Sequence, residues 1–258
     1  MINRIKEIMK YKELLFNLTR KELKLKYKNS VLGFFWSFLN PVVMLLVYTF
    51  AFKYVLRIQT ENFAVFLLAG LLPWTFFQMS VQGSTFSLIS NSALIKKVYF
   101  PREIIPLSLV FSNFVNFLMT FVVLFISMFI FKVKISIALI TLPLVLLIFL
   151  MITIGLCLLL SSINVVYRDV SHFVEVLFMA WFYLTPIVYS FDLVPDKLKI
   201  ITMLNPMTLV VETLRDCMIR GEMPRISYLL GMTAFAIIFM LVGHKVFSNI
   251  EKIFAEII

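Results

Sequence analysis

Residues 62–95 read NFAVFLLAGLLPWTFFQMSVQGSTFSLISNSALI and contain no charged side chain. A helix that crosses a bilayer needs about 20 consecutive, mostly apolar residues. This stretch therefore predicts a membrane-spanning helix with residues to spare, and the segment 70–74, which contains Pro73, is a candidate break within it. A membrane protein built of helices is the expected fold class.

The rest of the chain has the same character. Of its 258 residues 61% are hydrophobic and 15% are charged, and the mean hydropathy is +0.98. Soluble proteins are roughly 45–50% apolar and about 25% charged. Charged residues mark the ends of the apolar runs, because one at the centre of a bilayer costs roughly 2.5–3.5 kcal/mol. Six spans are predicted in a single transmembrane domain of residues 31–258, at about 31–55, 63–90, 104–131, 136–163, 170–191 and 226–246.

The first 30 residues have a different composition. They carry nine Lys or Arg and three Glu without a long apolar core, which argues against a signal peptide. Apolar residues recur at helical spacing among the basic ones, namely Ile5, Ile8, Leu15, Leu18 and Leu25. The pattern predicts an amphipathic helix over residues 1–30 that lies along the membrane surface. A solvated basic tail is the alternative.

The distribution of Lys and Arg predicts the orientation. With the amino terminus inside, 15 of these residues lie on the inner side and nine on the outer side, and five of the nine fall in the charge-balanced segment 192–225. Positive charge concentrates on the cytoplasmic side of membrane proteins. We expect a multi-pass protein of the plasma (inner) membrane with both termini cytoplasmic. Its basic residues then border membrane lipids, and nucleic acid is not an expected partner.

The inner connection between the second and third spans has an apolar tip. Val98, Tyr99 and Phe100 lie between Lys97 and Arg102, and Pro101 prevents a helix from continuing there. Exposed apolar side chains with charged neighbours commonly bind a protein partner. A loop whose rings rest among lipid head groups fits the pattern equally well, so both interpretations stay open.

Two short helices are predicted between the fifth and sixth spans, at about residues 195–218. Asn205 is expected to cap the second helix, with Pro206 at its first position. Neither segment is long and apolar enough to span, so we expect both to dip into or lie on the outer leaflet. A lid over an exit and a passive outer cap both fit this pattern.

Chemical motifs are scarce. No segment matches the phosphate-binding pattern Gly-x4-Gly-Lys-Ser/Thr, so no ATP site, and no other cofactor or metal site, is expected on this chain. Glu175 is the one carboxylate inside a predicted span, and an ion pair with Arg168 is its simplest role. A membrane-embedded transferase would need convergent acids or a histidine, and Asp169, His172 and Glu175 come nearest to that requirement.

Aromatic residues are abundant, with 28 Phe, 9 Tyr and 3 Trp. Most are expected to face lipid or fill helix contacts. Trp36 in the first span and a group of rings in the fifth could instead stack on the C–H faces of a sugar polymer. The group consists of Phe178, Trp181, Phe182 and Tyr189.

Five motifs taken together are similar to those of a known family. They are LKYKNSVLGFFWSFLNP at 25–41, LIKKVYFPREIIP at 94–106, NVVYRDV at 164–170, TPIVY at 185–189 and LNPM at 204–207. The match runs in this order along essentially the whole chain. The chain resembles the permease subunit of ABC-2 type polysaccharide exporters, which move O-antigen, teichoic acid or capsular polymers across the plasma membrane.

The resemblance implies a transport subunit and not an enzyme. It implies a homodimer bound to two copies of an ABC ATPase that hold ATP and Mg, with a lipid-linked polysaccharide as substrate. An ABC-2 exporter of a lipid or drug-like molecule, or a transferase acting on lipid-linked sugars, is the alternative.

The resemblance also assigns roles to residues. Coupling to the ATPase falls to Lys96, Lys97, Val98, Tyr99, Phe100, Pro101, Arg102 and Glu103. The polymer path falls to Trp36, Phe178, Trp181, Phe182 and Tyr189, and the outer gate to Asn205, Pro206, Glu212 and Arg215.

Overall fold

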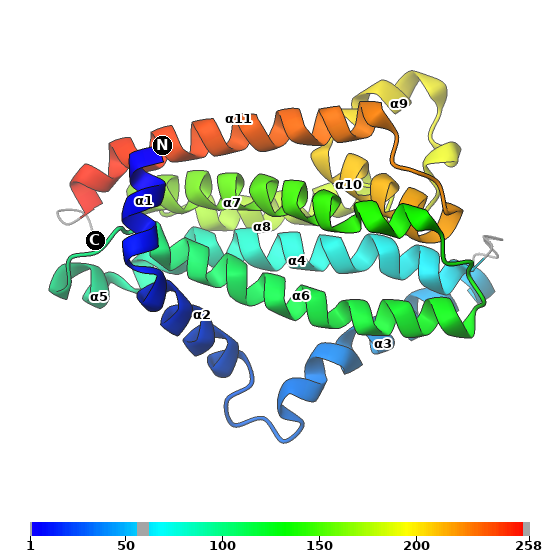
Figure 1. The fold of residues 1–258 in the computed structure, drawn as a ribbon, viewed down its shortest axis with the longest axis horizontal. Coiled ribbons are helices and arrows are strands. Elements are labelled where there is room, and N and C mark those ends of the chain that lie inside the picture. Colours follow the sequence, from blue (N-terminus) through cyan, green and yellow to red (C-terminus); the bar gives the residue numbers. More distant parts are fainter. Residues whose placement is uncertain (1, 56–61, 255–258) are drawn as a thin grey trace.

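The computed structural model describes residues 2–55 and 62–254 (Figure 1). These residues are almost entirely helical, and no strand occurs among them, which confirms the all-helical class. The α-helices of the described residues are α1 (Ile2–Lys10), α2 (Lys12–Lys26), α3 (Trp36–Tyr48), α4 (Phe63–Ser90), α5 (Ser92–Lys97), α6 (Ile104–Ile130), α7 (Leu142–Val166), α8 (Val170–Leu184), α9 (Asp196–Met203), α10 (Pro206–Arg215) and α11 (Ile226–Ile250).

Five helical segments are long and apolar enough to cross a membrane. They are Gly33–Phe52, Phe63–Ser90, Ile104–Ile130, Ile137–Val166 and Ile226–Ile253. At about 1.5 Å per residue, each matches or exceeds the roughly 30 Å hydrocarbon core of a bilayer. These segments correspond to five of the six predicted spans.

The remaining predicted span is shorter than expected. α8 has 15 residues, a length of about 22 Å. Its end follows from Pro186, because proline disfavours the helical conformation of the residue before it. Thr185 is accordingly extended, with φ −100° and ψ 133°. The predicted boundary at residue 191 is therefore wrong, and the chain turns at Thr185.

α4 lies at the centre of the molecule and packs against α6, α7, α8 and α10. It continues without interruption through Pro73, so the predicted break at residues 70–74 is wrong. Gly70, in that segment, lets Arg215 and the backbone of Ile187 lie close to α4. A Cβ there would lie 3.1 Å from both Nη2 of Arg215 and the carbonyl oxygen of Ile187. The uncharged run changes direction only at Asn91, which leads into α5.

α7 and α11 form the most extensive helix pair, and Figure 1 shows them running side by side. Gly155 and Gly243 lie where their backbones come closest. A Cβ on Gly155 would lie 2.7 Å from the carbonyl oxygen of Phe239, a distance that real Cβ atoms essentially never show. Only glycine permits this approach.

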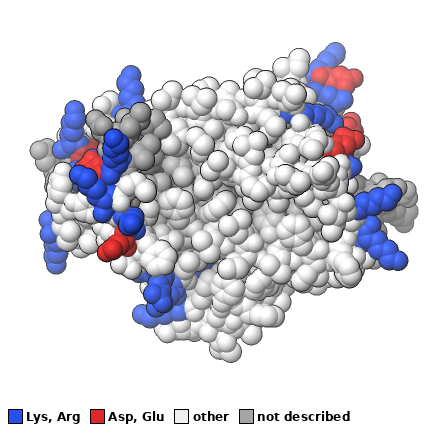
Figure 2. All heavy atoms as spheres, in the orientation of Figure 1, with Lys and Arg blue, Asp and Glu red and all other residues white. Residues whose placement is uncertain are grey.

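Charged side chains gather at the two ends of the molecule and leave a broad uncharged band between them (Figure 2). One end carries α1, α5 and the last turn of α11, and we name it the α5 end (Figure 1). The other end carries α9, and we name it the α9 end. An uncharged band between charged ends is typical of a protein that spans a bilayer.

Candidate functional site

The α5 end presents a short exposed segment, residues 96–99. Tyr99 is 81% exposed and Val98 is 52% exposed. Lys96 and Lys97 are exposed beside them. Apolar and basic side chains are thus exposed together at one projecting point, as both a docking segment and a loop among lipid head groups require.

The rest of the predicted coupling segment points inward. Phe100 is only 4% exposed and packs in a cluster with Ile104 and Phe247, which we name the α5-end cluster. Pro101 and Glu103 are also buried. Phe100 therefore anchors the exposed segment instead of projecting with Tyr99 as expected.

The amino-terminal helices cover this cluster. The predicted single helix over residues 1–30 is divided near Tyr11 into α1 and α2. Ile8, Leu15 and Leu18 pack against the α5-end cluster, so much of the predicted apolar face contacts protein. Leu25 is 48% exposed, and the side chain of Ile5 lies outside the described residues.

A cavity of ≈ 960 Å³ lies between α3, α4, α6 and α8. Three of the five predicted path residues line it, namely Trp36, Phe178 and Phe182. These rings come from the first and fifth predicted spans, to which the family resemblance assigned the path.

Trp181 and Tyr189 do not line the cavity. The indole Nε1 of Trp181 donates to Oδ1 of Asn205 at 2.8 Å. The hydroxyl of Tyr189 donates to the carbonyl oxygen of Tyr183 at 3.0 Å. Both side chains therefore hold the turn after α8 and the start of α10.

The cavity is also lined by aromatic rings that the sequence analysis did not assign to the path. Tyr48 and Tyr183 contribute, and Trp74 of α4 joins them. The ring centre of Trp74 lies 5.5 Å from that of Phe178 and 5.7 Å from that of Phe182. One wall of the cavity is therefore a continuous aromatic surface.

Polar side chains also line the cavity, and we name them its polar wall. The hydroxyls of Tyr27 and Ser37 donate to Oδ1 of Asn116, at 2.6 Å and 2.7 Å. Asn113 also lines this wall. Both asparagines stand in the apolar run 104–131, and polar residues inside a span often mark a substrate path. That signal was present in the sequence.

The two helices of the predicted outer gate have different surroundings. α9 is exposed at the edge, with Ile200 72% and Ile201 64% exposed, whereas every residue of α10 is buried. Oδ1 of Asn205 accepts from the backbone N–H of Met207 at 2.9 Å, with Pro206 in the first turn. The predicted cap is confirmed.

Arg215 ties α10 to the turn after α8. Its guanidinium donates to the carbonyl oxygens of Pro186 at 2.6 Å and Ile187 at 2.7 Å, and to Glu212 at 2.9 Å. The side chain of Arg215 is 1% exposed and that of Glu212 is 3% exposed. A buried charge needs such partners, because desolvation alone is costly. Arg220 also pairs with Glu212, at 2.8 Å.

Glu175 does not have the expected partner. Its side chain is 61% exposed and lies 3.9 Å from Nδ1 of His172, which is 82% exposed. Within residues 2–55 and 62–254 it forms no ion pair with Arg168. Glu175 therefore sits on an exposed face of α8.

Comparison with known proteins gives consistent matches. The family model described as ABC-2 type transporter matches residues 13–219. An O-antigen export system permease protein RfbA of Klebsiella pneumoniae is 36% identical, over 95% of this chain and 95% of the relative. The protein of that name from Myxococcus xanthus is 32% identical over 99% of each. The polysialic acid transport protein KpsM of Escherichia coli is 21% identical, over 90% of this chain and 91% of the relative.

Proposed function

The chain belongs to the ABC-2 type transporter family, and from this premise we propose that it is the permease of an ATP-driven exporter. Its cargo is a lipid-linked polysaccharide of O-antigen or teichoic-acid type, carried outward across the plasma membrane. The observation that carries this proposal is the near full-length similarity to O-antigen export permeases. The chain itself is a transport subunit, and the chemistry of ATP hydrolysis belongs to a partner.

A separate ABC ATPase supplies the energy in this proposal. The sequence has no phosphate-binding loop, while residues 96–99 offer Tyr99 beside two lysines. Aromatic side chains that fill a pocket dominate many protein interfaces. Two ATPase copies, each with ATP and Mg, would receive this segment from two copies of the chain.

The surroundings of the cavity support a homodimer. α3 and α8 border it, yet both keep large apolar side chains exposed, among them Val47 and Phe50 of the first span and Val176 of α8. A second copy would cover these faces and join two cavities into one path. The aromatic wall would then stack on sugar rings while Asn116 and its neighbours exchange hydrogen bonds with hydroxyls.

The α5 end faces the cytoplasm in this proposal, and the α9 end faces outward. The excess of Lys and Arg on the predicted inner side supports that orientation. α10 would form the outer gate, because it is wedged beside the turn that ends α8. Closure of the ATPase dimer would push residues 96–99 and move the spans as rigid bodies.

Export in living cells tests the proposal. Deletion of the gene should leave lipid-linked polymer inside the cell, and the wild-type gene should restore export. Tyr99→Ala should reduce export and co-purification of the ATPase. Phe129→Ala is the matched control, because Phe129 is 86% exposed near the opposite end of α6.

The exporter function and the coupling role of residues 96–99 would be refuted by different results. Unchanged polymer export in the deletion strain would refute the exporter. Full export with Tyr99→Ala and normal ATPase co-purification would refute only the coupling role of residues 96–99.

A further inference from the structure

Arg4 lies where three distant parts of the chain meet. Its Nε donates to Oε1 of Glu103 at 2.6 Å, and its Nη2 donates to Oε2 of the same carboxylate at 2.7 Å. Nη2 also contacts the carboxylate of Glu251. Helix α1, the start of α6 and the end of α11 are therefore joined by one guanidinium.

The contact between the Arg4 guanidinium and the Glu103 carboxylate is bidentate. Two parallel N–H···O bonds between Arg and a carboxylate fix orientation as well as charge. The side chain of Glu103 is 1% exposed, against 16% for Glu251 and 23% for Arg4. Among the described residues, Arg4 is the one hydrogen-bond partner of the Glu103 carboxylate. Loss of Arg4 would leave that charge buried and unpaired.

A second set of contacts joins residues 100–102, which directly follow the exposed segment, to the end of α11. Nη1 of Arg102 donates to the carbonyl oxygen of Glu251 at 2.6 Å. Phe254, three residues later, is fully buried and meets Phe247 edge-to-face, with ring centres 5.4 Å apart. Phe100 packs in the same cluster. Polar and apolar contacts thus hold the same two segments together.

These contacts continue into the membrane helices. Glu103 directly precedes α6, and Glu251 directly follows α11. α11 in turn meets α7 at the Gly155 and Gly243 contact. A displacement at Tyr99 therefore has a continuous packed route into three long helices.

We propose that Arg4, Glu103 and Glu251 form a latch that fixes α1, the start of α6 and the end of α11 as one rigid unit behind residues 96–99. This inference rests on the proposed function, because the latch makes α6 and α11 move together when the ATPase pushes the exposed segment. Without the latch, α5, a helix of 6 residues, would move independently of α6 and α11, so its displacement would not reach the long helices. Arg4 is a positioning residue in this scheme.

Two variants separate a latch from simple charge neutralisation. Arg4→Met leaves the Glu103 carboxylate buried without a partner and should lower thermal stability. Arg4→Met combined with Glu103→Gln removes that charge and should restore stability. If the three residues act as a latch, the double variant is stable but no longer couples ATP hydrolysis to export. If Arg4 serves only to neutralise the charge of Glu103, the double variant keeps that coupling. Arg20→Met, at an exposed position of α2, is the control.

The functional measurement uses the full chain with its ATPase in lipid vesicles. The double variant should hydrolyse ATP at the wild-type rate or faster while polymer exported per ATP falls about tenfold, since packed interfaces transmit motion by switching between discrete arrangements. Wild-type export per ATP in the double variant would overturn the latch. Wild-type protein without any export would instead contradict the proposed function.

A measurement that needs no transport tests the latch independently of the proposed export function. Spin labels on Met9→Cys and Lys252→Cys, in a chain with Cys157 and Cys217 replaced by Ala, report the distance between α1 and the end of α11. The labelled chain is diluted with unlabelled chain, so that each distance arises within one copy. The latch predicts a narrow distribution that becomes about twofold broader in the double variant, because the joined segments then move independently. An unchanged distribution would refute the latch whatever the protein transports.

Discussion

The guanidinium of Arg215 lies against the face of Phe66, with its central carbon 3.5 Å from the ring centre. Nη2 of the same arginine also donates to the carbonyl oxygen of Phe66 at 3.3 Å. One side chain of α10 thus contacts the first turn of α4 and the turn after α8. Stacking on an aromatic face and a planar set of donors are properties that lysine lacks.

Arg215→Lys should therefore destabilise the protein although it keeps the charge. The expected loss is about 3 kcal/mol of unfolding free energy, because hydrogen bonds to charged groups contribute about 1.5–3 kcal/mol each. Thermal unfolding of the purified protein measures it. Arg20→Lys is the control, since Arg20 lies at an exposed position of α2, and it should leave the transition unchanged. Equal transitions for the two variants would contradict the role given to Arg215.

Gly155→Ala should separate α7 from α11. Its Cβ would meet the backbone of Phe239, and overpacking of this kind costs typically about 1–3 kcal/mol. Gly83→Ala provides a matched helical glycine, because its Cβ would lie 3.8 Å from Leu109, an ordinary contact. Alanine is the better helix former, so Gly83→Ala should leave stability equal or higher. A Gly155→Ala protein as stable as Gly83→Ala would show that the helices are not in close contact there.

Phe182→Ala should slow export without affecting assembly. The ring lines the cavity beside Trp74, and an aromatic contact is worth about 0.5–1.5 kcal/mol, so we expect roughly a threefold to tenfold lower export rate. The rate at which polymer reaches the cell surface measures it, with ATPase co-purification as the check on assembly. Phe125→Ala, a 41% exposed ring of α6 that does not line the cavity, is the control. Equal rates for both variants would remove Phe182 from the path.

Sequence patterns predicted the features that depend on neighbouring residues. Uncharged runs predicted five helices of spanning length, because charge is excluded from the centre of a bilayer. Asn205 followed by Pro206 predicted a capped helix start, which depends on three adjacent residues. The early end of α8 was also predictable, since Pro186 restricts Thr185, but the apolar composition beyond it masked that signal.

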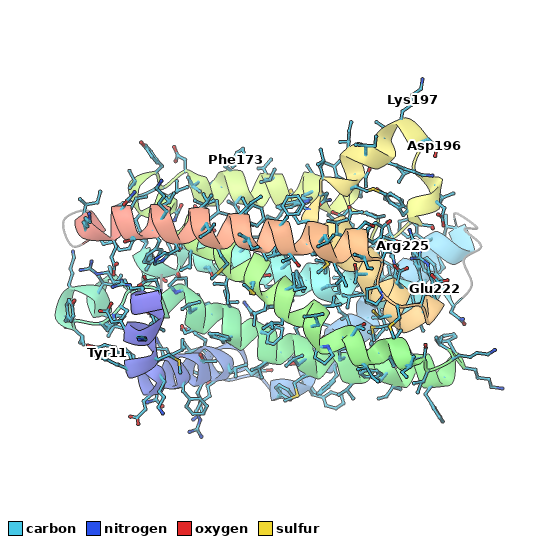
Figure 3. All side chains as sticks on the ribbon, turned by 45° about the horizontal axis from the view of Figure 1, so that its top comes forward. Tyr11, Phe173, Asp196, Lys197, Glu222 and Arg225 are labelled. Atoms are coloured by element: carbon cyan, nitrogen blue, oxygen red, sulfur yellow. The ribbon has the colours of Figure 1, made fainter. Side chains whose placement is uncertain are left out.

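The missed features join residues far apart in the chain. Arg4 lies 99 residues from Glu103 and 247 from Glu251, so no local pattern records their contact. The partners of Arg215 include backbone carbonyls, which carry no sequence signal at all. Phe100 and Tyr99 are adjacent aromatic residues with the same pattern, and only packing against the α5-end cluster turns Phe100 inward. Figure 3 shows Tyr11 near the α5 end, and Asp196, Glu222 and Arg225 toward the α9 end.

The central claim is that this permease moves polymer only when an ATPase acts on it through residues 96–99. Purified chain should be placed in vesicles with lipid-linked polymer, with and without its ATPase, and polymer transfer followed after addition of ATP. The account predicts transfer only when ATPase and ATP are both present, and its loss with Tyr99→Ala. Transfer by the chain alone, without a nucleotide-hydrolysing partner, would contradict it.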